Sequence, residues 1–204
     1  MSNKEEKFWE ELRYYVGSIC EAGEVAGAWM AGGMTQRNGI ETITQTKRSC
    51  REQKDVLLTK MCKAYKEPSA LAAAQALVEK SYHIIDQLKS LVQLLDTVQV
   101  GRPPQEMDPL VELMKESLQE MKKVMDYTVD RKANAMKMEA RCHRIYTYEE
   151  RGDGYRKEAL QYLYGQNQDP MVLLYWKDVL DQLEQILDST AGMVAPLQRL
   201  ATGL

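Results

Sequence analysis

The sequence has no long apolar run and no excess of charge of one sign. Its longest uncharged stretches, such as 25–36 and 68–78, fall well short of the roughly 20 apolar residues that span a bilayer. The 27 basic and 30 acidic residues give a formal charge of −3, so the basic surface that nucleic-acid binding needs is missing and we expect no nucleic-acid partner. The start of the chain carries mixed charge and does not resemble a signal peptide, which predicts a cytoplasmic protein.

The motifs of common catalytic and cofactor sites are also missing. There is no glycine-rich phosphate loop, no Gly-x-Ser-x-Gly elbow, no His-Glu-x-x-His and no Cys-x-x-Cys pair. A ferritin-like di-iron site would need two Glu-x-x-His motifs, but the residues three before His83 and His143 are Lys80 and Ala140. We therefore expect a protein that is not an enzyme, with partly buried histidines and four reduced cysteines in its core.

What the sequence does contain is six segments whose apolar residues recur every three or four positions, and none with the alternation of a strand. This pattern predicts an all-α protein with six helices. The expected helices run to about residue 29, from about 40 to the residue before 68, from about 71 to the break at 101–104, over 108–127, over 130–164, and from 170 to about the proline at 196.

Helix start and stop signals support these limits. Ser2-x-x-Glu5 predicts a capping box, and Gly32-Gly33 and Gly165 suit helix ends. Asp108-Pro109 and Asp169-Pro170 each place an N-capping side chain before a proline, whose missing N–H does no harm in the first turn. Pro196 is expected to limit or kink the last helix.

The two halves of the chain show an internal repeat. Pro68 matches Pro170 and Asp86 matches Asp188 at a constant offset of 102 residues. The sequence therefore predicts a first three-helix repeat over 1–100, a linker over 101–107 and a second three-helix repeat over 108–204, together forming one compact helical bundle.

Paired acidic residues stand out in the second repeat. Glu149 and Asp153 are four residues apart, as are Glu184 and Asp188, so each pair shares one face of its helix, on or beside the apolar stripe. Burying carboxylates is costly unless cations satisfy them, and an all-oxygen site suits iron, manganese or magnesium, with zinc also possible in principle. The alternative is that these are ordinary surface charges, solvated or paired with basic residues such as Arg156.

The first repeat keeps only part of this pattern. Its weaker candidate ligands are Asp55, Asp86, His83 and Glu52. Arg51 stands where the second repeat has a glutamate, and we expect it to pair with Asp55 and to lower the affinity for a cation. Any metal should therefore occupy the second half only.

Three stretches resemble the PhoU-like proteins, and most closely their DUF47 branch. They are Glu149-Glu-Arg-Gly-Asp153, then Asp169-Pro170, then Tyr175-Trp-Lys-Asp-Val-Leu-Asp-Gln-Leu-Glu184-Gln-Ile-Leu-Asp188; the opening Phe8-Trp-Glu-Glu-Leu is similar to the family's first helix. The likeness thus covers nearly the whole chain. It implies six helices in two repeats, and metal clusters bound by Glu/Asp-x-x-x-Asp motifs, which map here onto the four acidic residues of the second repeat.

The resemblance also implies a function. DUF47 proteins are described as accessory proteins of Pit-type phosphate transporters, so we expect a non-enzymatic regulator or accessory protein of inorganic phosphate transport. Its partner would be a phosphate transporter or a signalling protein, its membrane association would pass only through that partner, and a homo-oligomer is left open. Two alternatives remain: a metal-free helical adaptor that binds a protein partner, and a carboxylate-bridged metal enzyme, which lacks an accompanying nucleophile.

Overall fold

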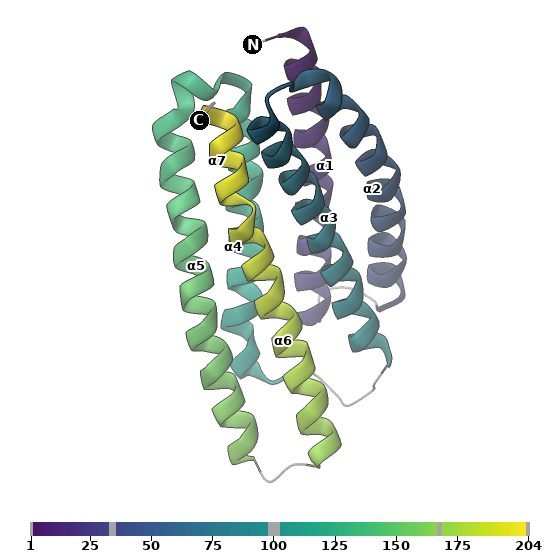
Figure 1. Cartoon of the computed structure of the whole chain (residues 1–204). Coiled ribbons are helices and arrows are strands. Elements are labelled where there is room, and N and C mark those ends of the chain that lie inside the picture. The colour runs from purple at the N-terminus through teal and green to yellow at the C-terminus, as the bar shows by residue number, and fades with distance from the viewer. Residues whose placement is uncertain (1, 33–35, 98–102, 167–168, 203–204) are drawn as a thin grey trace.

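The computed structural model describes residues 2–32, 36–97, 103–166 and 169–202, and nearly all of them are helical (Figure 1). The α-helices are α1 (Asn3–Met30), α2 (Gln36–Ala64), α3 (Pro68–Thr97), α4 (Asp108–Tyr127), α5 (Arg131–Gly165), α6 (Pro170–Gly192) and α7 (Val194–Thr202), with short 3-10 turns at Gln105–Met107 and Thr128–Asp130. These ranges contain no strand, which confirms the all-α prediction. No helix within them is long and apolar enough to cross a membrane.

The last predicted helix is divided in two, so the described ranges hold seven α-helices rather than the predicted six. The break falls at Met193, three residues before Pro196. Proline has no N–H to donate to the carbonyl four residues earlier, at Gly192, and its ring crowds that carbonyl. The chain tightens at this point, where the Met193 N–H donates to the Thr190 carbonyl at 3.2 Å.

Local capping follows the sequence at two of the three predicted sites. The Ser2 hydroxyl accepts from the Glu5 N–H at 3.3 Å while the Glu5 carboxylate accepts from the Ser2 N–H at 2.9 Å, which completes the predicted capping box. Asp169 accepts from the Met171 N–H at 2.7 Å. The prediction for Asp108 was wrong, because the turn at 105–107 leads directly into α4 and makes Asp108 its first helical residue.

The predicted breaks lie partly outside the described residues. Gly32, at the end of α1, has a φ of +75°, a backbone conformation that glycine adopts without strain. Gly33 is not among the described residues. The predicted linker is described only from residue 103, where two non-helical prolines lead into the 3-10 turn.

Helices α1 to α6 form two layers of three. α1, α2 and α3 pack on one another, α4, α5 and α6 do the same, and the layers meet where α1 packs on α4 and α3 on α6. The α5–α6 hairpin extends beyond the other helices at the lower end of Figure 1. A single apolar core runs through both layers, with Phe8, Trp9, Tyr15 and Trp176 among its large side chains.

Two predictions about individual side chains were wrong. Cys62 is exposed, because it lies one residue past Met61 and is therefore rotated by about 100° from the buried stripe of α2. His83 and His143 are exposed rather than partly buried, for the same reason: each neighbours a core residue, Ile84 or Cys142, and faces away from it.

Candidate functional site

The acidic residues predicted as a site lie on the two adjacent helices of the long hairpin. α5 carries Glu149 and Asp153, and α6, which packs against it, carries Glu184 and Asp188. The two glutamates are half-buried and the two aspartates are more exposed. We call these four residues the acidic cluster.

A glycine allows the two helices to approach at this level. Gly152 is buried, and a Cβ atom built on it would lie 2.6 Å from Cδ1 of Leu187. The Leu187 side chain therefore fills the space that any larger residue at position 152 would take. Because Gly152 and Leu187 are the direct neighbours of Asp153 and Asp188, we infer that this contact sets the spacing between the two acidic pairs.

The carboxylates of the acidic cluster influence one another electrostatically. Burial raises the pKa of Glu149 above its usual range, and the charges of Asp188 and Asp153 raise it further. Burial and the Asp153 charge likewise raise the pKa of Asp188. Partial burial and the charge of Asp188 raise the pKa of Glu184, against the opposing effect of Arg156. The cluster thus holds negative charge that its surroundings do not fully neutralise.

Arg156 pairs mainly with Asp181, an acidic residue beside the cluster that was not among the predicted site residues. Its Nε donates to Asp181 Oδ1 at 2.9 Å but lies 4.0 Å from Glu184 Oε2. Lys177 Nζ lies 2.5 Å from the other Asp181 oxygen. Burial alone would raise the pKa of Asp181, but the hydrogen bonds from Lys177 and Arg156 outweigh it and lower that pKa. The four-residue spacing of Lys177 and Asp181 was a usable signal for this pair.

The fit to a metal ion is chemical rather than geometric. Carboxylate oxygens are the donors that hard cations prefer, and burial together with the neighbouring carboxylates raises the pKa values of Glu149, Glu184 and Asp188. Within the described parts of the chain, however, no group of three or more His, Cys, Asp or Glu side chains is placed to hold a metal ion. Side chains of the acidic cluster would have to change conformation to form a ligand set.

In the first half of the chain, lysines of α2 pair with acidic side chains of α3. Asp86 forms an ion pair with Lys47 of α2. Lys54 Nζ lies 2.5 Å from Glu79 and 4.7 Å from the centre of the Tyr82 ring. These contacts supply internal cations between α2 and α3.

The other candidate ligands of α2 and α3 are exposed to solvent. Asp55, Glu52 and His83 are all exposed. The predicted pairing of Arg51 with Asp55 was wrong: among the described residues these two form no ion pair. Both lie on the exposed side of α2, where an ion pair gains little over separate solvation.

A further charged residue, Glu120 of α4, was also missed. Its side chain is 6% exposed and faces Arg141 at 2.6 Å, Lys123 at 2.9 Å and Arg144 at 3.6 Å. Burial would raise the pKa of Glu120, but the hydrogen bonds from Lys123 and Arg141 outweigh it and lower that pKa. Because the carboxylate is fully partnered, Glu120 ties α4 to α5 and does not offer a ligand site. The sequence did contain a signal for this burial: Glu120 follows the buried Ser117 by three residues and therefore lies on the same face of α4.

Comparison with known proteins gives a fold likeness and no match by sequence. No family model matches the chain, and no curated protein matches it. A PhoU-like protein from Shewanella oneidensis MR-1, known from a crystal structure, is 10% identical with a TM-score of 0.74, covering 97% of this chain and 100% of that one. A second protein from the same organism, described as a PhoU-like phosphate regulatory protein, is 11% identical with a TM-score of 0.72 and the same coverage. The predicted resemblance to PhoU-like proteins is thus confirmed as a shared fold.

Proposed function

We propose that this protein is a non-enzymatic regulator or accessory protein of inorganic phosphate transport, in the DUF47 branch of the PhoU-like proteins. The observation that carries the proposal is a fold shared over 97% of the chain with a protein described as a PhoU-like phosphate regulatory protein. In this interpretation α1–α3 and α4–α6 are the two repeats. The protein acts through its helical surface on a phosphate transporter or a signalling protein, and reaches a membrane only through that partner.

Recovery of the partner tests this role. The tagged full chain, purified from its native host under phosphate-rich and phosphate-poor conditions, should bring down a phosphate transporter or a phosphate-signalling protein. Recovery of neither would contradict the proposed role. Robust phosphatase or oxidase activity that is lost on Glu149→Gln or Glu184→Gln would contradict the non-enzymatic assignment.

We also propose that the acidic cluster takes up a metal cation. A bound cation would neutralise the mutually repelling carboxylates and link α5 to α6, without any reaction step of its own. Iron and manganese suit four carboxylate ligands, as does magnesium, and zinc also accepts them. The lysine-filled first repeat should take none, because Lys47 already neutralises Asp86.

Two matched substitutions test the metal proposal. Asp188→Asn should lower the manganese retained after dialysis, measured by elemental analysis, whereas Asp86→Asn should barely change it. Manganese at 100 times its Kd would stabilise the native state by about 2.7 kcal/mol, a rise in Tm of roughly 5–10 °C for a chain of this length. Asp188→Asn should remove that rise. Equal metal loss in both variants, or metal found only beside Asp55 and Asp86, would refute the assignment.

A metal-free helical adaptor is the second candidate function. It is favoured by the finding that no three potential ligand side chains are grouped for a metal in the described ranges. Elemental analysis of freshly purified protein separates the two candidates: the adaptor contains no bound metal and still binds its protein partner.

A further inference from the structure

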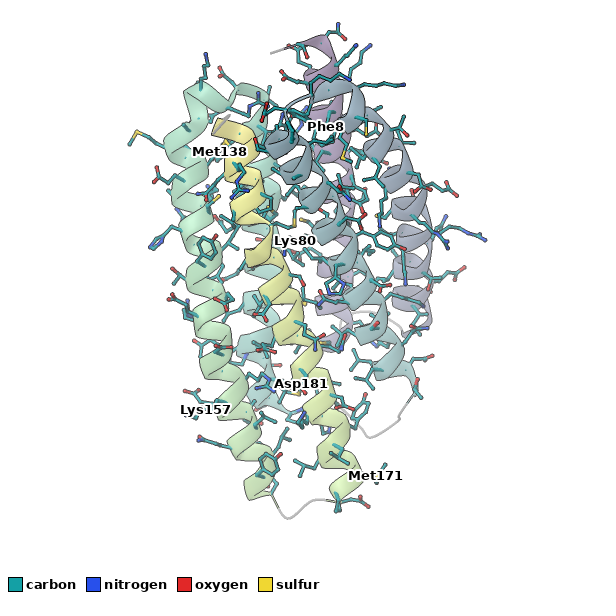
Figure 2. All side chains as sticks on the ribbon, in the orientation of Figure 1. Phe8, Lys80, Met138, Lys157, Met171 and Asp181 are labelled. Carbon is teal, nitrogen blue, oxygen red and sulfur yellow. The ribbon has the colours of Figure 1, made fainter. Side chains whose placement is uncertain are left out.

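A cavity of about 760 Å³ lies between the first turns of α5 and the short helix α7. It exists because α7, separated from α6 at Met193, packs mainly against α3 and only lightly against α5. The acidic cluster lies elsewhere on the same helix: ten residues, about 15 Å along α5, separate Glu139 of the cavity from Glu149. In Figure 2 Met138 lies near the upper end of the bundle, and Asp181 and Lys157 lie near the lower end.

The lining of the cavity combines an apolar floor with a cationic edge. Met138 and Leu197 contribute the floor and are both buried in the core. Arg131, Lys132 and Arg199 contribute three positive charges against the single negative charge of Glu139. A chain whose overall charge is slightly negative thus presents a net positive charge at this cavity.

Among the described residues, two of the three cations form no ion pair, and the third is held in place. In the described part of the chain, neither Lys132 nor Arg199 forms an ion pair. The Arg131 guanidinium lies 4.8 Å from the centre of the buried Trp9 ring, which fixes its position beside the cavity. Binding an anion here would therefore not require breaking an ion pair of Lys132 or Arg199.

We propose that this cavity binds a small organic anion. The phosphate, carboxylate or sulfonate group of the ligand lies against Lys132 and Arg199, and a compact aromatic or apolar body lies on Met138 and Leu197. The volume falls within the roughly 300–1,000 Å³ of pockets that hold small molecules, and such pockets are mostly apolar with a few convergent polar groups. Inorganic phosphate would leave the apolar floor uncovered, and a neutral apolar ligand would leave the cations without a partner. The proposal does not depend on the phosphate-transport role or on the acidic cluster.

A pair of fluorescent probes tests whether the cavity recognises both the anionic group and the apolar body of a ligand. 8-Anilinonaphthalene-1-sulfonate carries an anionic group on an aromatic body, and N-phenyl-1-naphthylamine has nearly the same body without the charge. Fluorescence titration of the full chain should show one site for the sulfonate probe and weaker binding of the neutral probe. Inorganic phosphate alone should compete only poorly.

Three variants locate the site. Lys132→Gln combined with Arg199→Gln should weaken sulfonate binding about tenfold, since each exposed cation contributes a few-fold, and should leave the neutral probe unaffected. Ala135→Trp should weaken binding of both probes by placing an indole ring across part of the cavity lining; Ala135 is exposed, so the core should remain intact. Lys157→Gln, an exposed cation at the far end of α5, is the matched control and should bind like the unmodified protein.

Several results would overturn the proposal. They are equal affinity for the two probes, unchanged sulfonate binding in the charge-removed double variant, and a loss as large in Lys157→Gln. If Ala135→Trp fails to fold, as judged by circular dichroism, the exposed charge variants still decide the outcome. Sedimentation on phosphatidylglycerol vesicles that follows the same variants, without probe binding in solution, would assign the cations to a lipid surface and would also overturn it.

Discussion

Gly152 offers a direct test of whether side-chain contact sets the spacing of α5 and α6. A methyl group at this position would meet Leu187 Cδ1 at 2.6 Å and Leu110 Cδ1 at 3.6 Å. Leu187 is 1% exposed, so its side chain has little room to move aside. Gly154, two residues further along the same helix, is exposed, and a methyl group there would touch nothing within 4 Å. The two glycines form a matched pair.

The expected magnitudes follow from two opposing effects. Replacing a glycine by alanine inside a helix favours folding by about 1 kcal/mol, through helix propensity and the reduced freedom of the unfolded chain. Gly154→Ala should gain that amount. Gly152→Ala gains the same amount but should lose about 1–3 kcal/mol through overpacking, because carbon atoms normally approach only to about 3.5–4 Å. The free energy of unfolding of the two variants should therefore differ by about 1–3 kcal/mol.

Urea unfolding of both variants, analysed with a common m value, measures this difference. Thermal unfolding should agree, with Gly154→Ala raised by about 2–4 °C and Gly152→Ala unchanged or lowered. If Gly152→Ala is stabilised as much as Gly154→Ala, Leu187 moves aside freely, and the proposed role of Gly152 in spacing the two acidic pairs is refuted.

Two further predictions concern a buried carboxylate and the thiols. Glu120→Gln should lower the free energy of unfolding by about 2–3 kcal/mol at pH 7, the value of charge-assisted hydrogen bonds. Because the folded-state pKa of Glu120 is depressed, its contribution is complete above the unfolded glutamate pKa of about 4.3 and is lost as the pH falls through the folded-state pKa. The two proteins should therefore converge in stability as the pH falls below the unfolded pKa and through the folded-state pKa; a constant difference would contradict this. In the native protein one thiol, that of Cys62, should react with a thiol reagent, whereas all four thiols should react after unfolding. The other three cysteines are buried, and burial raises the pKa of their thiols to about 11 or 12. Rapid modification of more than one thiol in the native state would show that the core opens readily.

The helical elements could be predicted from the sequence because their determinants are local. The apolar period marks the face of each helix that packs, and side chains such as Ser2 and Asp169 cap their helices from within a few residues. The division of the last predicted helix into α6 and α7 also has a local cause, Pro196. The prediction for Asp108 failed because a preceding 3-10 turn, which the apolar period does not mark, changed the starting point of α4.

The charged contacts could be predicted only in part, because spacing within one helix fixes which residues share a face and not which residues meet across helices. The sequence placed Glu149 with Asp153 and Glu184 with Asp188 on common faces, and the packing of α5 on α6 put the two pairs within electrostatic reach. Nothing local indicated that Arg156 would bind Asp181 more closely than Glu184.

The sequence by itself determined that this chain is helical, where most helices begin and end, and which acidic residues share a helix face, since each depends on residues within a few turns of one another. Tertiary structure alone decided that Glu120 pairs with Arg141, that Lys47 pairs with Asp86, and that a cavity opens between α5 and α7. These features join residues tens of positions apart. Their distances depend on how whole helices are rotated and packed, which the periodicity of any single helix leaves open.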